Sequence, residues 1–109
     1  MRKTNTVYLS GPMTGLPDNN FPTFNAAASG LRMLGYNVVN PAELDTKVEG
    51  LGTDQAWRQY MRADIKYLLD CDAIVMLPGW NESRVATLEH LIAQGLQMPV
   101  MTLSTTAQL

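Results

Sequence analysis

The stretch Cys71–Ala93, with the sequence CDAIVMLPGWNESRVATLEHLIA, decides the fold of this chain of 109 residues. Its segment Ala73–Leu77 is a short, continuous apolar run, typical of a central parallel strand that is covered on both faces. A proline and a glycine end that strand, and Asn81 or Ser83 can cap a helix that follows. The stretch therefore predicts a buried strand, a turn and a helix.

Glu89 lies in the middle of the helix face that should be buried. The apolar side chains on or beside its stripe of the helical wheel are Val85, Leu88, Ile92, Ala93 and Leu96. A lone buried carboxylate is costly unless it is paired, neutralised or used in chemistry. Glu89 is therefore either a functional group or an edge residue whose tip reaches water.

Composition and charge exclude several classes of protein. With 46% hydrophobic and 17% charged residues, residues 1–109 are expected to form one globular domain. The net charge of −2, without a basic cluster, argues against a nucleic-acid duplex or an anionic membrane as partner. No apolar run approaches the ~20 residues of a membrane span.

The chain enters its first strand without a signal-peptide core and has one cysteine, Cys71, so we expect a cytoplasmic protein. One cysteine and one histidine make a metal site improbable, and we expect no cofactor.

The rest of the chain alternates strands and helices. Strands are expected near residues 6–10, 36–40, 73–77 and 99–103. Helices are expected from Pro22 to a Gly35 cap, over residues 54–70, and after Ser83, whereas residues 16–20 and 41–53 read as loops. This alternation predicts an α/β fold with a small, doubly wound parallel sheet of the flavodoxin- or Rossmann-like kind. The expected strand order is 2-1-3-4, with helices on both faces.

Asp64 is a second carboxylate at a position where an apolar side chain belongs. Its helix stripe also holds Trp57, Tyr60, Met61, Ile65 and Leu68. If Asp64 were the only such carboxylate, a salt bridge to a nearby Arg or Lys would account for its position. Two such carboxylates, on the two helices that flank one strand, form a candidate site.

Two glycine-bearing loops should meet at the topological switch point of the sheet, where ligands bind outside the carboxyl ends of the strands. They are residues 10–15 (SGPMTG) and 78–83 (PGWNES). The N-terminus of the Glu89 helix can bind an anion there, and a phosphate would relieve the unfavourable position of Arg84 in the first turn. The residues expected to contact substrate or phosphate are Ser10, Gly11, Pro12, Met13, Gly15, Ser83 and Arg84. Four further side chains are expected either to line a pocket for the base or to belong to the hydrophobic core: Met13, Phe21, Trp57 and Trp80.

The segments Tyr8–Met13 and Asp70–Val75, together with Asp64 and Glu89, resemble nucleoside 2-deoxyribosyltransferases and the related 2'-deoxynucleoside 5'-monophosphate N-glycosidases. The strongest resemblance is to the small bacterial and phage proteins of the DUF4406 group, and it covers most of the chain. It implies a retaining attack on an N-glycosidic bond, with Glu89 as nucleophile and Asp64 as supporting carboxylate. It also implies a nucleotide or nucleoside ligand and a homodimer or higher homo-oligomer. In such an oligomer a neighbour's C-terminal segment, here with Ser104 or Thr105, completes each site.

Two positions depart from the pattern of these enzymes. Six residues before Glu89, the transferases carry an aspartate and the monophosphate hydrolases a phosphate-binding serine, so Ser83 favours nucleotides. Four residues before Glu89 these families usually carry glycine, and Val85 narrows the phosphate site. Three hypotheses remain: an N-glycosidase or deoxyribosyltransferase, a nucleotide-binding module without turnover, and an interaction domain whose carboxylates form structural ion pairs.

Overall fold

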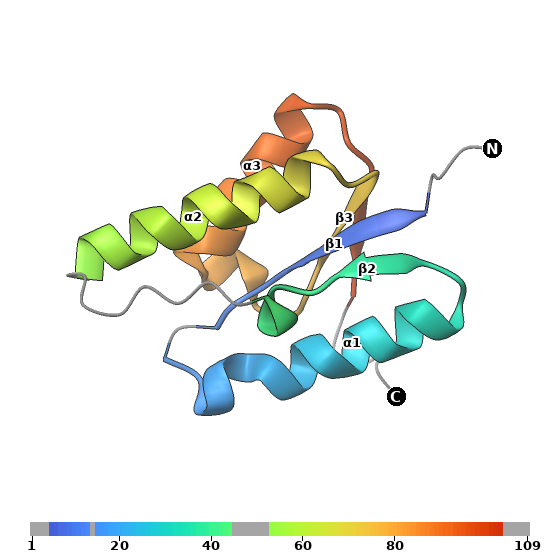
Figure 1. Ribbon diagram of the computed structural model, residues 1–109, viewed down its shortest axis with the longest axis horizontal. Coiled ribbons are helices and arrows are strands. Elements are labelled where there is room, and N and C mark those ends of the chain that lie inside the picture. Colours follow the sequence, from blue (N-terminus) through green and yellow to red (C-terminus); the bar gives the residue numbers. More distant parts are fainter. Residues whose placement is uncertain (1–4, 14, 45–52, 104–109) are drawn as a thin grey trace.

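A four-stranded parallel sheet forms the centre of the computed structural model, which describes residues 5–13, 15–44 and 53–103 (Figure 1). The strands are β1 (Thr6–Ser10), β2 (Asn37–Val39), β3 (Ala73–Met76) and β4 (Val100–Thr102). Their order is β2-β1-β3-β4, and each neighbouring pair is parallel. The predicted fold class and strand order are therefore confirmed.

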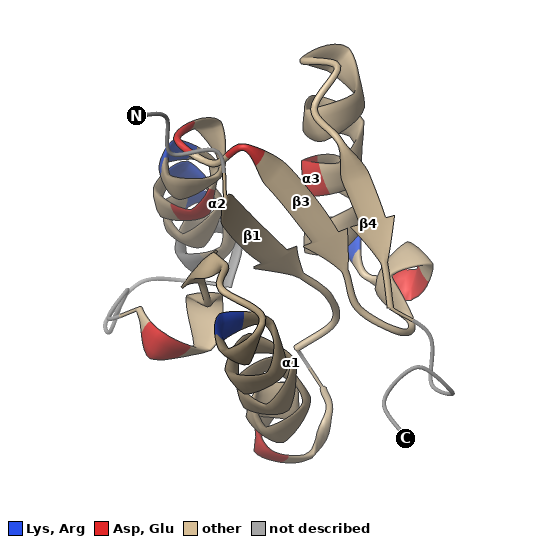
Figure 2. Ribbon diagram, turned by 90° about the vertical axis from the view of Figure 1, so that its right-hand side faces the viewer, with Lys and Arg blue, Asp and Glu red and all other residues tan. Residues whose placement is uncertain are grey.

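Three helices cover the two faces of the sheet: α1 (Phe21–Met33) lies on one face, and α2 (Thr53–Leu69) and α3 (Arg84–Gly95) lie on the other (Figures 1 and 2). The side chains of β1 alternate between them, as the period of two of a strand requires. Val7 and Leu9 pack in the core under α1, whereas Tyr8 packs in the core under α2 and α3. Ser10 follows the phase of Tyr8, so both face α3.

Local signals set the ends of the helices. The Ser83 hydroxyl accepts a hydrogen bond from the Ala86 N–H at 3.1 Å, so Ser83 rather than Asn81 caps α3. Gly35 (φ 100°) follows α1, and the Tyr36 N–H returns to the Leu31 carbonyl at 3.1 Å, as expected for a glycine that ends a helix.

Some expected boundaries were wrong. The two outer strands have three residues each instead of five; β2 ends at Val39 because the Asn40 side chain caps the next turn, η2 (Pro41–Glu43). Residues 17–20, expected to be loop, form a short turn, η1 (Pro17–Asn20). Leu96 is half exposed rather than buried, because α3 ends at Gly95.

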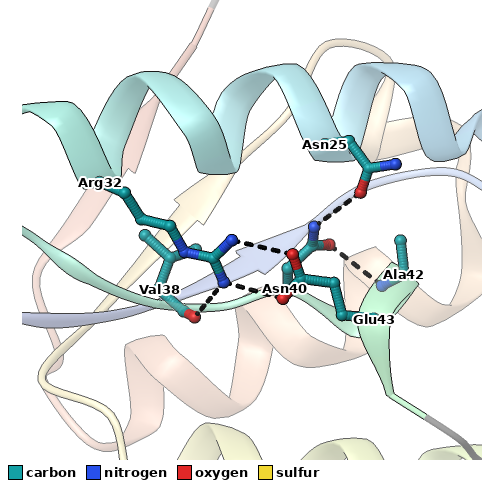
Figure 3. A network of polar contacts seen from close by, with 6 residues as sticks. All are labelled: Asn25, Arg32, Val38, Asn40, Ala42 and Glu43. Atoms are coloured by element: carbon teal, nitrogen blue, oxygen red, sulfur yellow. Dashed lines mark hydrogen bonds and ion pairs between the residues drawn. The ribbon is translucent and has the colours of Figure 1, made fainter.

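A polar network fastens η2 to α1 (Figure 3). Arg32 donates to both carboxylate oxygens of Glu43, each at 2.8 Å, and to the Val38 carbonyl at 3.1 Å. Buried Asn40 donates to Asn25 Oδ1 at 3.0 Å and accepts from the Ala42 N–H at 3.0 Å. The first part of the expected 41–53 loop is thus an ordered turn, whereas residues 45–52 lie outside the described ranges.

None of the described helices has the length and apolar character that crossing a membrane requires. Within the same residues, no three His, Cys, Asp or Glu side chains lie together as ligands for a metal ion.

Candidate active site

A cavity of about 350 Å³ opens at the carboxyl end of β1, where a doubly wound sheet is expected to bind its ligand. Strand β1 and its following loop, both helical layers and η2 contribute to its wall. The lining residues are Tyr8, Leu9, Ser10, Gly11, Met13, Asn19, Phe21, Phe24, Pro41, Leu44, Trp57, Tyr60, Asp64, Ser83, Val85 and Glu89. The two carboxylates singled out by helical phase therefore share one cavity.

Glu89 is only 2% exposed, and two hydroxyls of β1 hold its carboxylate. Tyr8 Oη donates to Oε2 at 2.7 Å, and Ser10 Oγ donates to Oε1 at 2.6 Å. Because Tyr8 and Ser10 are two residues apart on a strand, both side chains reach the same face. The alternative of an edge residue whose tip reaches water is wrong.

The environment raises the pKa of both carboxyl groups. Burial raises the pKa of Glu89 to about 7; the hydrogen bonds from Ser10 and Tyr8 oppose this shift, and the negative charge of Asp64 adds to it. Burial also raises the pKa of Asp64 to about 6. Among the described residues neither carboxylate forms an ion pair. Burial, and then the charge of Glu89, raises the pKa of Tyr8 well above its ordinary value, so Tyr8 remains a donor.

Helix α2 presents Trp57, Tyr60 and Asp64 to the cavity. Trp57 and Asp64 are seven residues apart, which places them about 10 Å apart along the helix axis. The Trp57 indole N–H is buried and has no hydrogen-bond partner within the part of the chain that the structure describes. The cavity therefore has a carboxylate end, with Asp64 and Glu89, and an end between Trp57 and the cap of α3.

The expected substrate-binding residues divide into two groups. Ser10, Gly11, Met13 and Ser83 line the cavity, whereas Pro12, Gly15 and Arg84 do not.

Close packing explains one of these glycines, and an aromatic contact explains the place of Arg84. A Cβ atom on Gly11 would lie 2.8 Å from the Cβ of Leu77, so the packing against the end of β3 requires glycine there. The Arg84 guanidinium lies 3.7 Å from the centroid of the Trp57 ring and lines a neighbouring groove.

Three of the four suggested base-pocket residues, Met13, Phe21 and Trp57, line the cavity. Trp80 instead packs against the half-buried His90, with ring centroids 4.3 Å apart.

Sequence reasoning missed Tyr8 and Asn19 as cavity residues. Tyr8 reads as an ordinary core residue of a strand; its available signal is the two-residue spacing from Ser10, which directs both hydroxyls to one face. Nothing in the sequence distinguishes Asn19 from the other polar residues of its expected loop.

Comparisons with known proteins agree with this architecture. The family model "Domain of unknown function (DUF4406)" matches residues 5–102. No functionally curated protein matches the chain at the sequence level. A solved structure of 2-deoxyribosyltransferase from Bacillus psychrosaccharolyticus superposes with a TM-score of 0.73 at 20% sequence identity. The match covers 91% of this chain and 72% of the transferase chain. The chain therefore belongs to the DUF4406 family and shares its fold with that 2-deoxyribosyltransferase.

Proposed function

We propose that the protein cleaves or transfers at the N-glycosidic bond of a 2'-deoxynucleotide or deoxynucleoside. The observation that carries the proposal is Glu89, a buried carboxylate that faces a cavity, is held by two hydroxyls and forms no ion pair among the described residues. A structural ion pair would require a cationic partner. The shared fold with 2-deoxyribosyltransferase supports the same reaction class.

In the proposed reaction a Glu89 oxygen attacks C1′ of the sugar while the bond from C1′ to the base nitrogen breaks. The bonding electron pair leaves with the base, and Asp64 donates a proton to the departing base and later accepts one from the attacking base or water. Its pKa of about 6 suits both roles near neutral pH. A second base or water then attacks C1′ and releases Glu89. Tyr8 and Ser10 orient the carboxylate and stabilise its ionised, nucleophilic form.

The distribution of side chains suggests how such a substrate lies. The sugar belongs at the carboxylate end, and the aromatic rings of Phe21, Trp57 and Tyr60 suit a planar base. The Ser83 hydroxyl accepts from Ala86, which leaves its own hydrogen free to donate at the N-terminus of α3. A 5'-phosphate at this helix terminus could accept from the Ser83 hydroxyl and from backbone N–H groups, so we propose that monophosphates bind better than nucleosides.

Val85 supports a second candidate, a nucleotide-binding module without turnover. The Val85 side chain lines the cavity beside the N-terminus of α3. The enzymes that this chain resembles usually carry glycine at that position. In this alternative the protein binds the nucleotide but does not cleave its N-glycosidic bond.

Incubation with 2'-deoxynucleosides and their 5'-monophosphates, with free base measured by chromatography, separates the candidates. The enzyme proposal requires base release by the native protein and a loss of several orders of magnitude in Glu89→Gln. Binding without base release supports the nucleotide-binding module. A protein that neither binds these ligands nor releases base is a plain interaction domain.

The cytoplasmic location and the homo-oligomer that the resemblance implies remain predictions. Ser104 and Thr105, expected to complete a neighbour's site, lie outside the described residues. Light scattering of the purified protein measures the oligomeric state directly.

A further inference from the structure

Three consecutive residues without glycine adopt left-handed backbone angles beside the cavity. Asp18 (φ 53°, ψ 29°), Asn19 (φ 54°, ψ 26°) and Asn20 (φ 60°, ψ 17°) form this left-handed turn. Asn and Asp tolerate such angles best among residues with a side chain, but normally as single residues. Backbone strain of this kind persists where the surroundings enforce it, and it clusters at ligand sites.

Hydrogen bonds on both sides hold the left-handed turn. The Asn19 N–H donates to the Leu16 carbonyl at 2.9 Å, and the Phe21 N–H donates to the Asp18 carbonyl. The Asn20 side chain donates to the Pro12 carbonyl at 2.9 Å, which ties the turn to the loop after β1. The turn therefore has a fixed place between two lining residues of the cavity, Met13 and Phe21.

Asn19 lines the cavity, and among the described residues its carboxamide has no hydrogen-bond partner. The neighbouring Asn20 side chain instead donates to the Pro12 carbonyl. Asn19 thus offers the cavity one oxygen acceptor and two N–H donors.

An amide with an adjacent donor and acceptor matches the hydrogen-bonding edge of a nucleobase, as asparagine does on adenine. Enzymes that bind an isolated base read its edge with hydrogen bonds and hold its face between aromatic or apolar side chains. Met13 and Phe21, which line the same cavity, are apolar side chains of this kind. The sugar instead matches the carboxylate end of the cavity.

We propose that Asn19 is the base-specificity residue of this cavity, and that the left-handed turn is retained because it presents the Asn19 carboxamide to the edge of the base. This inference rests on the proposed nucleoside or nucleotide ligand. It adds that the protein discriminates among bases, and it assigns that discrimination to one side chain.

The chain offers a matched control, because Asp18 has the same backbone angles as Asn19 but does not line the cavity. Glycine adopts positive φ freely, so Asp18→Gly and Asn19→Gly should both fold with an unchanged or raised Tm. Asn19→Asp is a third variant, which keeps the shape and removes the amide donors.

Calorimetric titration with the four common 2'-deoxynucleosides and their 5'-monophosphates measures the discrimination without requiring turnover. The native protein should prefer one base. Asp18→Gly should keep that preference, whereas Asn19→Gly should lose about tenfold in affinity for the preferred base and Asn19→Asp should change the order of preference. Base preference that is unchanged in Asn19→Gly and Asn19→Asp overturns this inference alone. Equal binding of all bases by the native protein also overturns it, and no binding of any ligand overturns the proposed function itself.

Discussion

The Tyr8 hydroxyl and the Glu89 carboxylate lie 2.7 Å apart across 81 residues of chain, and their hydrogen bond joins the first strand to the last helix at the candidate site. Both side chains are almost fully buried. Because the bond favours the ionised form of Glu89, it opposes the effect of burial on the pKa of this residue.

Replacement of Tyr8 by phenylalanine should raise the pKa of Glu89 above about 7, because burial then acts against one donor fewer. The acidic limb of the pH–rate profile for base release should move to higher pH, and kcat should fall about 10- to 100-fold while KM changes little. A Tyr36→Phe variant serves as control, since Tyr36 does not line the cavity. An unmoved pH profile in Tyr8→Phe would show that this hydroxyl does not tune the carboxylate.

Stability should fall as the pH rises through the neutral range. The folded-state pKa values of Glu89 (about 7) and Asp64 (about 6) exceed the ordinary values of 4.5 and 3.8, so the folded protein holds protons that the unfolded chain releases. The contribution is fully present below about pH 4 and is lost as the pH rises through 6 and 7. For Glu89 it is on the order of 3 kcal/mol.

Urea denaturation at pH 5 and pH 8 measures this difference in the free energy of unfolding. Glu89→Gln, which stays neutral, should flatten the dependence and gain relative stability at pH 8. A native protein that becomes more stable between pH 5 and pH 8, with no effect of Glu89→Gln, would contradict the assigned pKa shifts.

Ser83 should act both as helix cap and as phosphate donor, and two substitutions separate these roles. Ser83→Ala loses the cap, at a cost of about 1 kcal/mol, together with the preference for monophosphates. Ser83→Asp keeps the cap but repels a phosphate, so nucleoside binding should survive while monophosphate binding falls at least tenfold. Thermal shift with matched nucleosides and monophosphates reads both effects; equal shifts in all three proteins would leave Ser83 as a cap alone.

In the polar network that fastens η2 to α1, the buried Asn40 should contribute more to the free energy of unfolding than the exposed ion pair. Asn40 is 1% exposed, and Asn40→Ala leaves the Ala42 N–H without its acceptor, so we expect a loss of about 1–3 kcal/mol. The Arg32–Glu43 pair is about half exposed, and Glu43→Gln should cost less than about 1 kcal/mol. Chemical denaturation of both variants tests the order; a larger loss in Glu43→Gln would contradict it.

Periodicity alone predicted much of this molecule. The apolar run Ala73–Leu77 and the alternation of elements led to the sheet order, and helical phase singled out Glu89 and Asp64. These inferences succeed because burial imposes a repeat of two or 3.6 residues on the sequence.

Features that depend on contacts between distant segments could not be predicted. The pairing of Tyr8 and Ser10 with Glu89 requires the position of α3 over β1. Arg84 was expected at an anion, yet it packs on Trp57, a contact between two helices. The left-handed turn of residues 18–20 has a sequence that also suits an ordinary polar loop.

The central claim is that Glu89 forms a covalent bond to the sugar during base release. The most direct test is mass spectrometry of the protein after rapid acid quenching during turnover of a substrate identified in the base-release assay. We predict that the peptide carrying Glu89 gains the mass of the sugar, or of the sugar phosphate for a monophosphate, and that Glu89→Gln gains none. Base release at an undiminished rate by Glu89→Gln, or sugar attached to another residue, would contradict the account.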